Sequence, residues 1–232
     1  MNHPIEFVSL GPGEPELITL KGLKALQQAD CIFCPATTTR EGNQVSRATD
    51  IMQALDIPLS VIKPFNLPMS KERGAALAAY DQVYEEAKTR YGQQQRVVIV
   101  AEGDAGFYSS IQYIFEKLQT AGIPAQRIAG IPAFIAAGAV ANLHIASQEE
   151  RMIVAPGTLT AGEIEQYHRE GTVVVIMKLS QCAHEVQQCM QLHPDYRYHY
   201  FENVGTEKEF YTHQLEELKE RRFPYFSLMI IK

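Results

Sequence analysis

Two short turns in the sequence combine glycine with acidic side chains, and each follows a predicted strand. Gly11–Glu16 (GPGEPE) comes after the apolar stretch Ile5–Leu10, and Glu102–Gly106 (EGDAG) comes after Val97–Val100. In an open α/β sheet, ligands bind where strands end and helices begin. The two turns are therefore the first candidates for a binding site.

The residues of these turns argue against a phosphate-bearing ligand. Pro12 and Pro15 remove two backbone amide donors, and Glu14 and Glu16 would repel a phosphate. The second turn carries charge of the same sign, so we expect a neutral ligand or one with an amine or sulfonium. Simpler roles stay open: Asp104 as the N-cap of the next helix, and the two glutamates as partners of a helix dipole.

Lys178 ends the strongly apolar stretch VVVIMK. Its side chain either extends to solvent or faces a cleft, where it would attract an anionic substrate. Further turns follow predicted strands at 129–134 and 156–158.

Alternating apolar periods of two and 3.6 residues predict an α/β fold. We expect two α/β domains, residues 1–120 and 121–232, with a cleft between them. The predicted strands are Ile5–Leu10, Cys31–Cys34, Leu59–Lys63, Val97–Val100, Arg127–Ala129, Met152–Ala155, Thr172–Met177, Arg197–Glu202 and Phe226–Ile231. The predicted helices are Thr19–Gln28, Ser46–Leu55, one from an N-cap at Ser70 to a C-cap at Gly92, one from Phe107 to about Gln119, Ala133–Ala141, Ala161–Arg169, Gln181–Gln191 and Thr212–Arg221.

The composition is that of an ordinary soluble globule, with 232 residues, 46% hydrophobic residues and a formal net charge of −6. This charge argues against a nucleic-acid binder with a broad basic face. No apolar run has membrane-spanning length, and the N-terminus lacks the pattern of a signal peptide. We expect a cytoplasmic protein with no membrane partner.

The cysteines are Cys31, Cys34, Cys182 and Cys189. The first two lie on a predicted strand, where residues three apart point to opposite faces. No histidine or cysteine set has zinc spacing, and we expect buried or incidental thiols and no metal site.

Several of these motifs resemble those of the tetrapyrrole (corrin/porphyrin) methylases. GPGEPELITLKGLKALQQAD is similar to the family's GxGPGDPELLTxKAxxxLxxAD, EGDAGFYSS to its GDPxxYG/S turn, and AGIPAFIAAGA to its PGxSSxxAAAA segment. The matches keep their order over essentially the whole chain. This chain departs from the family pattern at Ala105 and Ala129, where the family usually has proline, at Pro132-Ala133, usually Ser/Thr, and at Glu14, usually Asp.

The resemblance implies a class III methyltransferase-like fold, S-adenosylmethionine as methyl donor, S-adenosylhomocysteine as product, and a homodimer. It places the cofactor between the two domains. The residues that would line it are Pro12, Glu102, Gly103, Asp104, Tyr108, Pro132, Ala133, Met177, Val204 and Gly205.

KPFNLPMSKERGAALAAYD and VVIMKLS resemble the branch of this family that methylates C-20 of precorrin-2 in cobalamin biosynthesis. That reaction needs a base for the C-20 proton, and the candidates are Asp104, Tyr225 or water. Lys178 would attract the anionic substrate. The tetrapyrrole carboxylates need cations, and the candidates are Arg40, Arg47, Lys63, Lys71 and Arg73. Methylation at another corrin position, a non-tetrapyrrole acceptor and a non-catalytic ligand sensor stay open.

Overall fold

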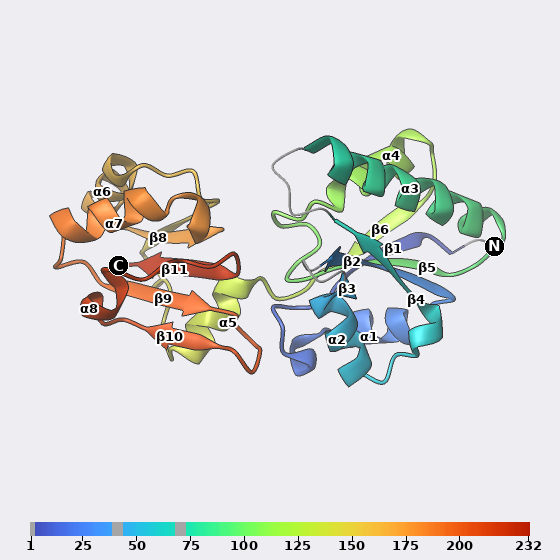
Figure 1. The fold of residues 1–232 in the computed structure, drawn as a ribbon, viewed down its shortest axis with the longest axis horizontal. Coiled ribbons are helices and arrows are strands. Elements are labelled where there is room, and N and C mark those ends of the chain that lie inside the picture. The colour runs from blue at the N-terminus through green and yellow to red at the C-terminus, as the bar shows by residue number, and fades with distance from the viewer. Residues whose placement is uncertain (1–2, 39–43, 68–72) are drawn as a thin grey trace. The chain divides into compact units, whose positions relative to one another are not determined.

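The computed structural model describes residues 3–38, 44–67 and 73–232. It divides into two compact units, Met1–Pro132 and Ala133–Lys232 (Figure 1). The division falls after Pro132 and not after residue 120, because β6 (Ala125–Ile128) pairs with β1 (Ile5–Ser9) and so belongs to the first sheet. Both units are of the α/β class that the sequence predicted.

A mostly parallel sheet forms the centre of the N-terminal unit. Its strands run in the order β3-β2-β5-β1-β6, with β4 also paired to β2. Among the described strands of this sheet, only the β2–β3 pairing is antiparallel. The carboxyl ends of β5, β1 and β6 therefore lie next to one another, which brings the loops after them together. The other strands are β2 (Cys31–Thr38), β3 (Gln44–Val45), β4 (Ile62–Asn66) and β5 (Val97–Ala101).

Helices cover both faces of this sheet (Figure 1). On one face, Val98 and Val100 pack with buried residues of α1 (Leu20–Gln27) and α2 (Arg47–Ala54). On the other, Ile99 packs with α3 (Arg73–Gly92) and α4 (Gln112–Thr120). Burial on both faces explains why β5 is continuously apolar.

The cysteines confirm the expectation of buried thiols. Cys31 and Cys34 lie in the cores on opposite faces of the first sheet, as strand geometry requires. Cys182 and Cys189 lie in the core of the C-terminal unit. All four are free, and burial raises the pKa of each thiol, to about 11 for Cys31 and Cys182.

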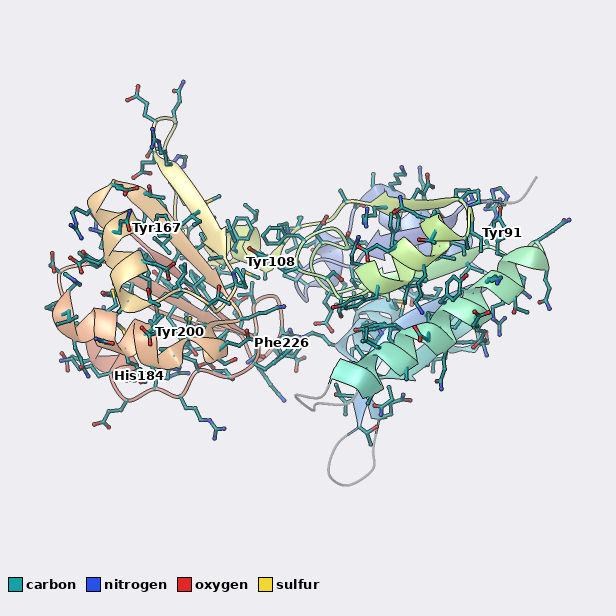
Figure 2. All side chains as sticks on the ribbon, turned by 90° about the horizontal axis from the view of Figure 1, so that it is seen from above. Tyr91, Tyr108, Tyr167, His184, Tyr200 and Phe226 are labelled. Carbon is teal, nitrogen blue, oxygen red and sulfur yellow. The ribbon has the colours of Figure 1, made fainter. Side chains whose placement is uncertain are left out.

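The C-terminal unit contains a mixed sheet in the order β10-β9-β11-β8-β7. Only β7 and β8 pair in parallel among the described strands of this sheet. Tyr200, fully buried, packs in the core formed with α6 and α7 (Figure 2). The elements are α5 (Ala133–Val140), β7 (Arg151–Ala155), α6 (Ala161–Arg169), β8 (Thr172–Met177), α7 (Ala183–Leu192), β9 (Tyr198–Glu202), β10 (Phe210–Thr212), α8 (Leu215–Leu218) and β11 (Ser227–Ile231).

Three predicted elements begin later in the structure than the sequence predicted. The helix expected over Thr212–Arg221 is only the short α8, and its expected first residue, Thr212, instead ends β10, the edge strand that pairs with β9. The strand expected at Leu59–Lys63 begins with a 3-10 turn over Leu59–Val61. The helix expected from Phe107 begins at Gln112, after a loop.

The end of α3 also differs from the expectation. Gly92 is still helical, and the residue that takes the left-handed conformation after the helix is Gln94, with φ of 62°. The proposed N-cap, Ser70, lies outside the described residues. Among the residues that are described, no helix is both long and apolar enough to cross a membrane.

Candidate functional site

The two acidic glycine turns lie side by side at the carboxyl edge of the first sheet. The Gly11 amide donates to the Gly103 carbonyl at 3.1 Å, and the Gly103 amide donates to the Gly11 carbonyl at 2.6 Å. Both glycines have positive φ, 80° and 69°, which other residues adopt only at a cost. A Cβ added at Gly103 would meet no atom within 4 Å, so open space borders the second turn. Pro12 is buried within the first turn.

Asp104 connects the second turn to the loop after β6. Its Oδ1 accepts from the Gly106 amide at 2.8 Å, and its Oδ2 accepts from the Gly130 amide at 2.7 Å. The alternative role of helix N-cap is wrong, because α4 begins at Gln112 and its N-cap, Ile111, has no side-chain cap. Asp104 therefore orders two loops, and both of its oxygens hold backbone amides.

Glu102 lies beside Arg47, the first residue of α2. An Arg47 guanidinium nitrogen is 3.7 Å from a Glu102 carboxylate oxygen, and the two side chains are 19% and 25% exposed. Burial raises the pKa of Glu102, and the nearby Arg47 opposes that shift. The fold thus brings one of the candidate cations directly to the acidic turn.

The other candidate cations are elsewhere or outside the description. Lys63 is exposed on β4, opposite Phe33 in the sheet register, and lines a cavity of about 590 Å³ with residues of α3. Arg73 is the first residue of α3. Arg40 and Lys71 lie outside the described residues.

A second group of predicted site residues lies at one edge of the second sheet. Met177 ends β8 and pairs with Leu228 of β11. The exposed Lys178 follows with φ of 56°, a left-handed conformation that costs energy in a non-glycine residue. The loop after β7 packs against it: a Cβ added at Gly157 would lie 2.4 Å from the Lys178 carbonyl oxygen.

The Val204-Gly205 loop belongs to the same edge. It follows β9, and the Asn203 amide donates at 2.9 Å to the carbonyl of Phe226, which Figure 2 labels. Tyr225 directly precedes Phe226 in the chain. The Tyr225 side chain is 60% exposed. Antiparallel pairing of β11 with β8 and β9 brings Met177, Gly205 and Tyr225 to one edge although they are far apart in sequence.

Three predicted cofactor residues lie in connecting segments or directly after one. Tyr108 is 43% exposed in the loop before α4, with φ of 50° (Figure 2). Pro132 is the last residue of the N-terminal unit, and Ala133 begins α5. That the two strand edges and these segments form one cofactor site stays a prediction.

Ser9 is a residue that sequence reasoning missed. It is fully buried at the end of β1, with its hydroxyl between the loops after β5 and β6. The available signal was one small polar residue at the end of the apolar strand IEFVSL. Within residues 3–38, 44–67 and 73–232, no group of three or more His, Cys, Asp or Glu side chains is placed to hold a metal ion.

Comparison with known proteins gives a consistent family match. The model of the family Tetrapyrrole (Corrin/Porphyrin) Methylases matches residues 4–219. The chain is 26% identical over 228 residues to a precorrin-2 C(20)-methyltransferase from Sinorhizobium sp, covering 97% of this chain and 93% of that protein. It is also 26% identical to a probable cobalt-precorrin-2 C(20)-methyltransferase from Methanocaldococcus jannaschii, covering 97% and 94%.

A solved structure shares the fold. Uroporphyrin-III C-methyltransferase from Thermus thermophilus, complexed with S-adenosylhomocysteine, superposes with a TM-score of 0.70 at 18% identity, covering 99% of this chain and 97% of that one.

Proposed function

The chain belongs to the tetrapyrrole (corrin/porphyrin) methylases, and from this membership we propose that it transfers a methyl group from S-adenosylmethionine to C-20 of precorrin-2, or of its cobalt form, in cobalamin biosynthesis. The choice of C-20 as the methylated carbon rests on the match along 97% of the chain to two relatives that are both named for C-20. The motifs KPFNLPMSKERGAALAAYD and VVIMKLS support the same choice.

The residues at the edge of the first sheet fit such a methyl donor. Glu102 and Asp104 are carboxylates beside the open space at Gly103, and opposite charge favours a sulfonium or an amine there. The paired glycine turns let a ligand approach the backbone closely. We assign Pro12, Glu102, Gly103 and Asp104 to the cofactor, together with Tyr108, Pro132, Ala133, Met177, Val204 and Gly205.

The cofactor supplies a methyl group already activated by positive sulfur. The protein's contribution is then to hold the acceptor carbon in line, and such positioning contributes roughly 7–11 kcal/mol. Lys178 and Arg47 would attract substrate carboxylates, with Arg40, Lys63, Lys71 and Arg73 as further candidates. A base finally takes the C-20 proton, and the side chains that we propose for this role are Asp104 and Tyr225.

The deciding experiment is incubation of the purified chain with S-adenosylmethionine and reduced precorrin-2, with and without cobalt, followed by mass spectrometry and NMR of the product. We expect a gain of one methyl group at C-20. A methyl group at another carbon would overturn the position, and no turnover despite tight binding of S-adenosylhomocysteine would favour a ligand sensor.

Variants of Asp104 separate a proton-transfer role from an ordering role. Asp104→Asn keeps an acceptor oxygen for a loop amide but cannot take a proton, and Asp104→Ala removes both functions. If Asp104 is the base, both variants lower turnover by about 10²–10⁴-fold. If it only orders the loops, Asp104→Asn retains most of the turnover that Asp104→Ala loses. Tyr225→Phe and Lys178→Ala test the remaining roles, and Lys178→Ala is expected to raise KM for the tetrapyrrole.

A further inference from the structure

From a fully buried position, Ser9 joins the ends of β1 and β6 to the turn after β5. It ends β1, and its hydroxyl donates to the Ile128 carbonyl oxygen of β6 at 2.7 Å. The same hydroxyl oxygen accepts from the Ala105 amide, in the turn after β5, at 2.8 Å. A buried hydroxyl is costly unless it is hydrogen-bonded, and here both its donor and its acceptor capacity are used.

These bonds close a ring with those of Asp104. Asp104 precedes Ala105, and its Oδ2 accepts from the Gly130 amide at 2.7 Å, two residues after Ile128. The Ser9 hydroxyl also lies 3.5 Å from that Oδ2. The turn after β5 is therefore joined to the end of β6 twice, once through Asp104 and once through Ser9. A Cβ added at Gly130 would come within 2.3 Å of the Ser9 Cβ, which shows how closely the two segments pack.

The bond from Ala105 requires a backbone N–H, which proline lacks. The family motif GDPxxYG/S has proline at this position, and the motif GxGPGD has glycine where this chain has Ser9. A chain with that glycine and that proline has neither the hydroxyl nor the amide. In this chain the two departures occur together and make one hydrogen bond.

We propose that Ser9 is a positioning residue for the cofactor site, and that the Ser9–Ala105 hydrogen bond takes the place of a proline ring in fixing the Glu102–Gly106 turn. The proposal rests on the proposed function, because the turn matters only if it binds the methyl donor. It predicts that the effects of substitutions at positions 9 and 105 on ligand binding are not additive.

The test compares ligand binding in Ser9→Ala, Ser9→Gly, Ala105→Pro and the double variant Ser9→Gly/Ala105→Pro. Asp30→Ala is the matched control: its Oδ2 accepts from the Arg96 amide at 2.7 Å, between the residues that precede β2 and β5 at the opposite edge of the same sheet. Calorimetry with S-adenosylhomocysteine gives Kd, and urea denaturation confirms that each variant is folded at the temperature used.

We expect each single variant at position 9 or 105 to weaken binding about tenfold, the size of one hydrogen bond. Asp30→Ala should leave Kd within about twofold even if it lowers stability by a similar amount. The double variant should bind more tightly than Ala105→Pro alone. A second readout, amide hydrogen exchange without ligand, should show faster exchange at Ala105 and Gly130 in Ser9→Ala than in Asp30→Ala.

Two failures are distinguishable. If the wild-type chain binds no S-adenosylhomocysteine, the proposed function and with it the site role of Ser9 are overturned. If the wild type binds but Ser9→Ala and Asp30→Ala change Kd equally, or if the effects at positions 9 and 105 simply add, the positioning role alone is overturned.

Discussion

Glu102 and Glu202 occupy similar places in the two units but have opposite pKa shifts. Glu102 directly follows β5, and Glu202 is the last residue of β9, so each lies at the edge of its sheet where the predicted ligand loops begin. Burial raises the pKa of Glu102. Burial would also raise the pKa of Glu202, but hydrogen bonds from Arg221 and Tyr200 outweigh it and lower that pKa.

The difference follows from how well each carboxylate is paired. Arg221 Nε donates to Glu202 at 2.7 Å, the Tyr200 hydroxyl donates to the same oxygen, and the guanidinium packs 3.8 Å from the centre of the Phe210 ring. Arg47 is 3.7 Å from Glu102. A buried carboxylate with the weaker pairing gains more from a cationic ligand than one that the protein already satisfies. The comparison therefore favours Glu102 as a ligand contact and Glu202 as a structural anchor.

The largest expected effects on stability come from substituting two closely packed glycines, Gly130 at the edge of the first sheet and Gly157 at the edge of the second. Gly130→Ala would place a Cβ 2.3 Å from the Ser9 Cβ, and Gly157→Ala would place one 2.4 Å from the Lys178 carbonyl oxygen. Each should lower the free energy of unfolding by about 1–3 kcal/mol or more, because backbone has to shift. Urea denaturation followed by circular dichroism measures this, since the chain has no tryptophan.

Gly162→Ala is the matched control for these two variants. Gly162 lies in α6, and an added Cβ would meet nothing within 4 Å. Alanine there should raise stability by about 0.5–1 kcal/mol. Peptide-level hydrogen exchange should locate the loss from Gly130→Ala in the N-terminal unit and that from Gly157→Ala in the C-terminal unit. A loss of stability spread equally over both units would contradict the expectation that each variant destabilises only the unit that contains it.

Glu202→Gln should have an intermediate effect that depends on pH. The folded state lowers the pKa of Glu202 below its usual 4.5, so its contribution is present above that pH and is lost as pH falls through the folded value. At neutral pH we expect a loss of about 1–3 kcal/mol, the cost of breaking a charged hydrogen bond. Urea denaturation from pH 7 to pH 3 should show wild type and variant converging at the acid end. A constant difference at all pH values would contradict the role of the charged carboxylate.

Glu102→Gln should have the smallest effect on stability and the opposite pH dependence. The folded state raises the pKa of Glu102, so its contribution is greatest below the usual 4.5 and is lost as pH rises through the raised value. At neutral pH, the lost ion pair and the removed cost of burying charge largely cancel, and we expect a change within about 1 kcal/mol. Calorimetry should nevertheless show weaker binding of S-adenosylmethionine. A stability loss as large as that of Glu202→Gln would remove the distinction between the two residues.

Local patterns in the sequence predicted much of the fold. Ala161–Arg169 and Thr172–Met177 were predicted with the bounds that the structure shows. Thr19 and Ser46 cap α1 and α2 where the sequence placed the helix starts. Periodicity failed at Thr212–Arg221, where Thr212 ends β10 in pairing with β9 and only Leu215–Leu218 is helical. Whether Thr212 extends a strand or starts a helix depends on its pairing with Tyr200 of β9, which the apolar spacing around Thr212 does not report.

What the sequence by itself determined is the chemistry of the strand-end turns: glycine for positive φ, acidic side chains in place of phosphate-binding amides, and the family to which these motifs belong. Only the tertiary structure decided which groups meet there. The bond from Gly130 to Asp104 spans 26 residues, and that from Ser9 to Ile128 spans 119. Such contacts depend on the parallel order β5-β1-β6, which brings the ends of strands that are distant in sequence to one edge of the sheet. The side chains that order the site could therefore be identified only after the chain was folded.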